Sequence, residues 1–295
     1  MLPRKVTGGG EGLVTHGGLV WLGAVADRVG LSAGLRAATT GLEWRKHQPG
    51  HSLGLITLGL ADGATCVSDL SAIRGQVNLF GEVASHPTAW RSFNRLGPEH
   101  LAGIDTATAD AREVVWRADP DADRTEMVID LDASIITTKA DKQDAAPTWK
   151  RTYGHRPLFA IDAERGEILA QVLRPGNAGS NTAADHVTVL GAAIDALPER
   201  ETAGHNVGDD PDDVEVDVWV RTDAGGTTHW LAEECRDRNL GFSLGYFIDS
   251  RVRDALLMVQ EEDWTPAVQA NGHHRPGLVT LCPGSFDVCD QHLDR

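Results

Sequence analysis

The sequence has few cysteines and no long apolar run. Its cysteines are Cys66, Cys235, Cys282 and Cys289, and they show no CxxC spacing. This argues against a zinc ribbon and against a disulfide framework. No apolar run reaches membrane-spanning length, and residues 1–12 lack the apolar centre of a signal peptide. We therefore expect a cytoplasmic chain with reduced cysteines and no membrane partner.

Basic residues are also scarce, which bears on nucleic-acid binding. The 295 residues include 27 Lys and Arg against 43 Asp and Glu, a formal net charge of -16. Phosphate contacts need Lys and Arg, so this balance alone argues against a nucleic-acid partner. Residues 1–120, however, hold 11 basic and 11 acidic residues, and the remaining 175 hold 16 and 32. The excess charge therefore belongs to the second part of the chain, and DNA binding by the first part stays open.

Apolar residues recur at helical spacing through the first part of the chain. We predict an all-α N-terminal region over residues 1–122, followed by a second domain over residues 123–295, because a polar linker, ADPDAD, lies near residue 122. The predicted helices cover residues 19–29, 31–38, 53–60, 66–73, 85–96 and most of 98–124. The first two helices, separated by Gly30, are either a DNA-binding helix-turn-helix or a pair that only packs a core.

The predicted helix over residues 85–96 carries a polar and basic face. Its members are Thr88, Arg91, Asn94 and Arg95, at helical spacing. These side chains offer the donors that major-groove recognition uses. An amphipathic helix with a solvated face is the equally acceptable alternative.

Two aspartates follow an apolar alternation in the stretch EMVIDLDAS, residues 126–134. Met127, Ile129 and Leu131 fall on one face of a strand, so Asp130 and Asp132 share the other. Taken alone, this is either a half-exposed strand with two solvated acids or the first half of a carboxylate metal site.

A second strand, over residues 214–222, leads into another aspartate, Asp223. Between the two, the pattern predicts strands at 157–162 and 168–173 and a helix at 181–197, and beyond it a helix at 228–239 and a strand at 240–247. This is the element order of an RNase H-like fold, in which the ends of the first and fourth strands lie side by side. Asp132 and Asp223 would then hold Mg²⁺ or Mn²⁺ for in-line attack on a phosphodiester.

A basic cluster lies between the first two predicted strands. It consists of Lys150, Arg151 and Arg156, near the position at which the DNA backbone would pass the metal site. The alternative is an exposed cluster without a specific role. The nearby segment 174–186 lacks a phosphate-loop signature and is better interpreted as a capped entry into a helix.

Several stretches of the chain resemble DDE-type transposases of bacterial insertion sequences, specifically those with the DDE domain called group 1. The resemblance covers nearly the whole chain up to about residue 268. It is carried by LVTHGGLVWLGAVADRVGL, LADGATCVSDLSAIRGQVNLFGEVASHPTAWR, VIDLDASI, RPGNAGSNTAADHVTVL, VRTDAGGTTHWL and EEDWTPA.

The resemblance implies an RNase H-like core, Mg²⁺ or Mn²⁺ dependence, and cutting and joining of double-stranded DNA at terminal inverted repeats by a homo-oligomer. It places the first catalytic aspartate at Asp132, with Asp130 as the fallback, and the second at Asp223. The family's third carboxylate, a glutamate on a helix beyond the fifth strand, has no counterpart before Arg295. Residues after about 270 stop resembling the family and lack clear periodicity.

The missing carboxylate leads us to expect a truncated and inactive copy with an uncovered sheet face and poor solubility. The alternatives are a non-catalytic DNA-binding remnant that inhibits an intact transposase, and a nuclease that works with two carboxylates.

Overall fold

The computed structural model describes residues 16–119, 123–139, 142–179, 182–268 and 273–281. Contacts divide the chain into two compact units, Met1–Leu244 and Gly245–Arg295. The domain boundary predicted near residue 122 stays a prediction, and residues 120–122 lie outside the described ranges. Among the described residues, no helix combines the length and the apolar character needed to cross a membrane.

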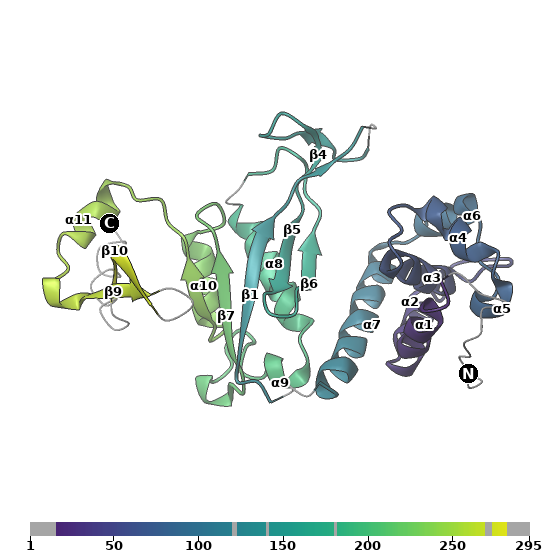
Figure 1. Ribbon diagram of the computed structural model, residues 1–295, viewed down its shortest axis with the longest axis horizontal. Coiled ribbons are helices and arrows are strands. Elements are labelled where there is room, and N and C mark those ends of the chain that lie inside the picture. The colour runs from purple at the N-terminus through teal and green to yellow at the C-terminus, as the bar shows by residue number, and fades with distance from the viewer. Residues whose placement is uncertain (1–15, 120–122, 140–141, 180–181, 269–272, 282–295) are drawn as a thin grey trace. The chain divides into compact units, whose positions relative to one another are not determined.

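The N-terminal region is helical, as predicted, and precedes the sheet (Figure 1). A core of Leu19, Leu55, Ile73 and Ala89 holds its helices together. Gly30 separates the first two helices in the left-handed conformation, at φ 86°, which glycine adopts without steric cost. The elements are α1 (Leu19–Arg28), α2 (Leu31–Ala38), α3 (Pro49–Ala61), η1 (Val67–Leu70), α4 (Ser71–Arg74), α5 (Val77–Phe80), α6 (His86–Phe93) and α7 (Pro98–Arg117).

The helix predicted over residues 85–96 is shorter in the structure, and this corrects the predicted polar face. α6 ends at Phe93, so Asn94 is its C-cap and Arg95 lies outside it. The reason is local: Gly97 and Pro98 begin α7, and the backbone N–H of Gly97 donates to His100 Nδ1 at 3.0 Å. The guanidinium of Arg95 donates to the carbonyl of Glu43 at 2.8 Å. The four residues therefore do not form one continuous helix face.

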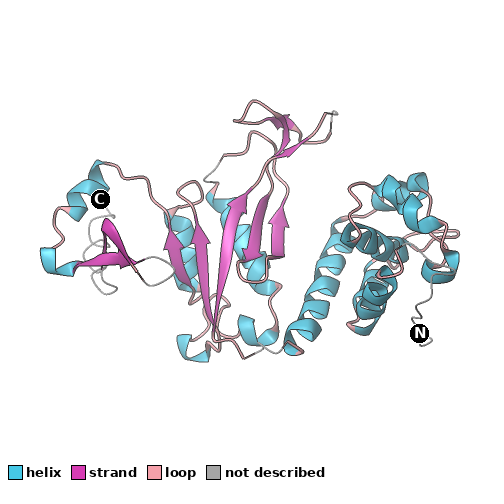
Figure 2. Ribbon diagram, in the orientation of Figure 1, coloured by secondary structure: helices cyan, strands magenta, loops and turns pink. Residues whose placement is uncertain are grey.

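The second part of Met1–Leu244 is built on a five-stranded mixed sheet (Figure 2). The strand order is β6-β5-β1-β7-β8, in which β7 is parallel to both β1 and β8, and β5 is antiparallel to both β1 and β6. This confirms the predicted RNase H-like topology. The elements are β1 (Glu126–Ala133), β5 (Leu158–Asp162), β6 (Glu167–Val172), α8 (Ala183–Asp195), α9 (Glu199–Thr202), η2 (Pro211–Asp213), β7 (Asp217–Thr222), α10 (His229–Asp237) and β8 (Gly241–Leu244).

One face of this sheet forms the main core. Met127, Ile129 and Leu131 are buried, as the alternation predicts, and they join a cluster with residues of β7, α8 and α10. Each such side chain contributes about 1.5–3 kcal/mol when removed from water. Asp130 and the exposed Trp219 and Arg221 alternate with the buried positions of β1 and β7, so they lie on the opposite face.

Three short strands between β1 and β5 form a separate small sheet, which the periodicity did not predict. They are β2 (Ile136–Thr137), β3 (Ala146–Pro147) and β4 (Tyr153–His155), in the order β2-β4-β3. A Cβ on Gly154 would lie 2.0 Å from the carbonyl oxygen of Ile136, so the strands approach this closely only with glycine. The small sheet lies at the arrowhead end of β1 (Figure 1).

The unit Gly245–Arg295 contains α11 (Ser250–Leu256), η3 (Glu261–Asp263) and an antiparallel pair, β9 (Trp264–Val268) and β10 (His274–Leu281). The lack of periodicity noted after residue 270 was misleading, because β10 is a strand of eight residues.

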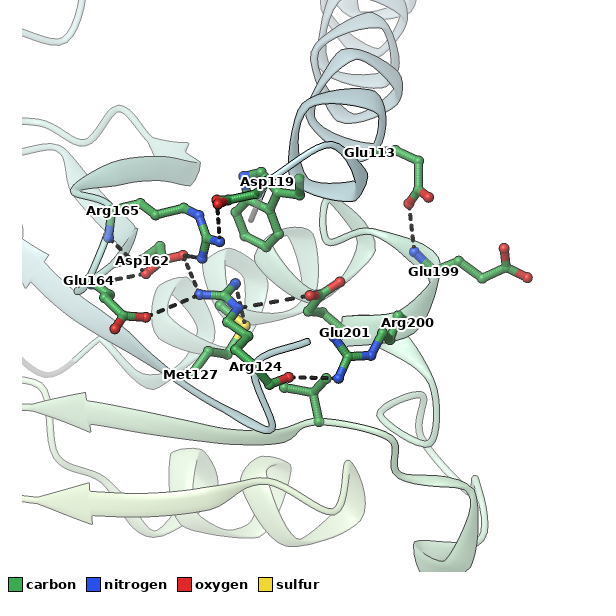
Figure 3. A network of polar contacts seen from close by, with 12 residues as sticks. Glu113, Asp119, Arg124, Met127, Asp162, Glu164, Arg165, Glu199, Arg200 and Glu201 are labelled. Carbon is green, nitrogen blue, oxygen red and sulfur yellow. Dashed lines mark hydrogen bonds and ion pairs between the residues drawn. The ribbon is translucent and has the colours of Figure 1, made fainter. Parts of the chain in front are cut away.

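A network of ion pairs joins α7 and the β5–β6 turn to the sheet (Figure 3). The buried carboxylate of Asp162 binds Arg124 Nη1 at 3.1 Å and accepts the backbone N–H groups of Glu164 and Arg165. The guanidinium groups of Arg124 and Arg165 also lie 4.5 and 4.6 Å from the ring centroid of Trp116 in α7. The network therefore ties three separate segments together.

Replacement of Asp162 by Ala should lower the free energy of unfolding by about 3–5 kcal/mol, because it removes a fully buried carboxylate that binds Arg124 and accepts two backbone N–H groups. Glu164 is the matched control: it contacts the same guanidinium at 3.6 Å but is exposed, so Glu164→Ala should cost under about 1 kcal/mol. Urea unfolding followed by circular dichroism measures both. Equal losses for the two variants would show that burial does not set the strength of this network.

Candidate functional site

Asp132 and Asp223 lie together at one end of the central strands. β1 and β7 are parallel, and their last registered pair is Leu131 with Thr222. The next residue along the chain after each of these is an aspartate, and both aspartates line one cavity of about 230 Å³. The structure thus brings together the two residues that the sequence proposed as a pair.

Hydrogen bonds from the backbone orient both carboxylates. Asp132 Oδ1 accepts the N–H of Ala133 at 2.7 Å. Asp223 Oδ1 accepts the N–H groups of Gly225 and Gly226 at 2.8 and 3.2 Å, within the turn that leads to α10. Within the described parts of the chain, these bonds use only the Oδ1 atom of each carboxylate.

Asp130 has a different environment. Its two oxygens accept a bidentate pair of hydrogen bonds from Arg221, from Nε at 2.6 Å and from Nη2 at 2.8 Å. These bonds raise the pKa of Arg221, because they stabilise its charged form. Asp130 does not line the cavity that holds Asp132 and Asp223.

Only some of the predicted basic residues line this cavity. Lys150 and Arg156 line the cavity, together with Trp149. Arg151 is next to Lys150 in sequence but does not line the cavity. The predicted DNA contacts Arg91, Asn94 and Arg95 do not line it either. The cavity therefore combines two carboxylates with two cationic side chains.

His186 of α8 is a cavity residue that the sequence did not single out. Its side chain is only 2% exposed, and Nδ1 lies 3.0 Å from the carbonyl oxygen of Thr182. Burial lowers the pKa of His186, because desolvation disfavours the imidazolium. The sequence alone could not identify this residue, because His186 is far from Asp132 and Asp223 in the chain and only the fold brings it into their cavity.

Arg174 is a second residue that sequence reasoning missed, and it fixes the wall of the cavity. Its buried guanidinium donates to the carbonyl of Arg156 at 3.0 Å and to Asp185 of α8 at 3.3 Å. Arg156 in turn donates from its backbone to the carbonyl of Arg174 and from Nη1 to that of Ala178. The segment that begins at Arg174 therefore anchors the basic wall to α8.

The donor set suits a hard divalent cation. Mg²⁺ is commonly held by one or two carboxylates, while water and substrate oxygens complete its coordination. Within the described parts of the chain, no three His, Cys, Asp or Glu side chains are grouped closely enough to hold a metal on their own. Asp132 and Asp223 are therefore a donor pair of the kind that Mg²⁺ uses, and Lys150 and Arg156 add positive charge to the same cavity.

The mixed sheet and its paired strand-end carboxylates define an RNase H-like protein with a candidate metal-dependent site. A family model described as "Transposase DDE domain group 1" matches residues 4–279, so the chain belongs to this transposase family. The match extends beyond residue 268, where the resemblance in the sequence was expected to fade. No curated protein matches the chain at a significant level.

Solved structures provide weaker likenesses. The Mos1 mariner paired-end complex with Mn is 13% identical, with a TM-score of 0.26, and the match covers 68% of this chain and 60% of that one. The large terminase nuclease from thermophilic phage G20c with bound magnesium is 14% identical, with a TM-score of 0.20, and the match covers 59% and 80%.

Replacement of Gly226 by Ala should distort the turn that carries Asp223. The added Cβ would lie 2.2 Å from Thr222 Oγ1 and 2.9 Å from His186 Nε2, so the turn or the imidazole must move. We expect a loss of about 1–3 kcal/mol in the free energy of unfolding, measured by urea titration. Gly179→Ala is the control, because its nearest contact would be an ordinary 3.5 Å. A Gly226→Ala variant as stable as the control would contradict the close packing of this turn.

Proposed function

We propose that this protein acts in DNA transposition by cutting and joining double-stranded DNA at terminal inverted repeats. The observation that carries the proposal is the convergence of Asp132 and Asp223 on one cavity with Lys150 and Arg156. Membership of the transposase family supports the substrate class.

In this proposal, Asp132 and Asp223 hold Mg²⁺ or Mn²⁺ through their carboxylate oxygens. When bound, the ion supplies Lewis-acid stabilisation of the phosphodiester and of the attacking oxygen. Lys150 and Arg156 bind the flanking phosphates, and Arg156 is held in place by its bond to Ala178. Arg151, Arg91, Asn94 and Arg95 remain proposed DNA contacts outside the cavity. A homo-oligomer would bring two DNA ends together.

A second candidate function is DNA binding without catalysis, as a remnant that occupies terminal repeats or inhibits an intact transposase. The observation that favours it is the donor set: in the described residues, the cavity offers two carboxylates and no third. Under this second candidate the chain binds DNA ends and does not cut them.

Asp132→Asn and Asp223→Asn should each lower the affinity for Mn²⁺ at least tenfold, because each variant removes an anionic ligand. Binding is measured by electron paramagnetic resonance of free Mn²⁺, in the presence of DNA. Asp130→Asn is the matched control: it lies two residues away on the same strand, and its carboxylate is bound to Arg221, so Mn²⁺ affinity should not change. Loss of Mn²⁺ affinity in Asp130→Asn alone would contradict this proposal and would identify Asp130 as the metal ligand.

Labelled DNA from the ends of the encoding element separates the two candidate functions. Cleavage with Mg²⁺ or Mn²⁺ that both variants abolish would establish catalysis by the chain. Salt-sensitive binding without cleavage would favour the non-catalytic binder. Absence of binding to any such DNA would exclude both.

A further inference from the structure

Trp149 stands out on the rim of the cavity. Its side chain is 69% exposed, although it lines the same cavity as Asp132 and Asp223. A large aromatic surface left in water loses the stabilisation that burial would give. Its position beside a charged cavity therefore points to a ligand with a flat apolar face.

The loop that carries Trp149 is held in a fixed shape. It connects β3 to β4, and Thr148 donates from its backbone to the carbonyl of Thr152 at 2.7 Å. The hydroxyl groups of these two threonines lie 2.6 Å apart, and the N–H of Arg151 closes the turn on the carbonyl of Thr148 at 3.0 Å. Arg151 adopts a left-handed conformation, φ 60°. Trp149 is therefore presented by an internally bonded turn.

The small sheet beneath this loop is anchored to the cavity wall. A Cβ on Gly176 would lie 2.2 Å from the carbonyl oxygen of Ala146 in β3 and 2.5 Å from that of Gly154 in β4. Gly176 belongs to the segment that Arg174 ties to Asp185 of α8. The position of Trp149 relative to the carboxylates is thus set by packed backbone.

The charge around Trp149 suits a nucleic acid. Lys150 Nζ lies 5.1 Å from the centroid of its ring, and Arg156 lines the same cavity. An exposed aromatic ring among cationic side chains is the arrangement with which proteins bind unpaired bases, because the ring stacks on the base and the cations hold the phosphates.

We propose that Trp149 stacks on an unpaired base next to the phosphodiester positioned by Asp132 and Asp223. The site then prefers single-stranded or locally unpaired DNA to an intact duplex. This inference rests on the proposed function for its substrate class, DNA, but it concerns a contact that neither carboxylate makes.

Binding without metal tests the contact separately from cutting. The probes are a 20-nucleotide oligothymidylate and the same strand paired with oligoadenylate, titrated in EDTA and followed by fluorescence anisotropy. Trp149→Leu should weaken binding of the single strand about tenfold or more, and Trp149→Phe should weaken it much less, because phenylalanine keeps an aromatic face. Trp230→Leu is the control, since Trp230 is 65% exposed on α10 and does not line the cavity; its affinity should not change.

A second measurement locates the base. Oligothymidylate with one 5-iodouracil, irradiated in the complex, should cross-link to Trp149, which mass spectrometry of the digested protein identifies. Equal weakening of single-strand and duplex binding by Trp149→Leu, or a cross-link only to other residues, would overturn the proposal. Thermal unfolding of each variant checks that the fold is intact.

The outcomes also separate this inference from the proposed function. If Trp149 stacks on the base but the cleavage assay shows no metal-dependent cutting, the base contact is supported and the proposal of cutting is contradicted. If Trp149→Leu leaves cutting unaffected and no cross-link forms at Trp149, the proposal of cutting is supported and the base contact is contradicted.

Discussion

The parallel pairing of β1 with β7 is the interaction on which the candidate site depends. These two strands are distant in sequence, and between them run the small sheet, the β5–β6 hairpin and α8. Their backbone hydrogen bonds place Leu131 opposite Thr222, and an aspartate follows each of these residues in the chain. The other sides of the cavity come from α8, which contributes His186, and from the loop of the small sheet, which contributes Trp149 and Lys150.

Ion pairs and hydrogen bonds hold the opposite end of the sheet. Arg112 and Trp116 of α7 both donate to Glu167 of β6, at 2.7 and 3.1 Å. With the cluster around Asp162, these bonds give the helical N-terminal region a polar attachment to the sheet. Polar attachments of this kind depend on geometry, because a buried charge without its partner is costly. One end of the strands therefore carries the candidate site, and the other end attaches the sheet to the helical N-terminal region.

Much of this architecture could be predicted from periodicity. The alternation in β1 and β7 gave the buried face, and the order of elements gave the sheet topology and the pairing of Asp132 with Asp223. The small sheet could not be predicted, because strands of two or three residues are too short to show a period. Arg174 and His186 could not be predicted for another reason. Their roles depend on contacts between segments that only the fold brings together. The end of α6 was predicted too late because residues 94–97 form the turn that leads into α7, and periodicity does not show how many residues such a turn needs.

The ion pair between Asp130 and Arg221 has a consequence for strand alignment. These residues are registered partners, so a slip of one residue would place Asp130 opposite Val220 or Thr222 and break both hydrogen bonds. The same slip would turn each side chain of β1 to the wrong face and separate Asp132 from Asp223. The pair is therefore satisfied in only one register of β1 against β7, which is the register that brings Asp132 and Asp223 together.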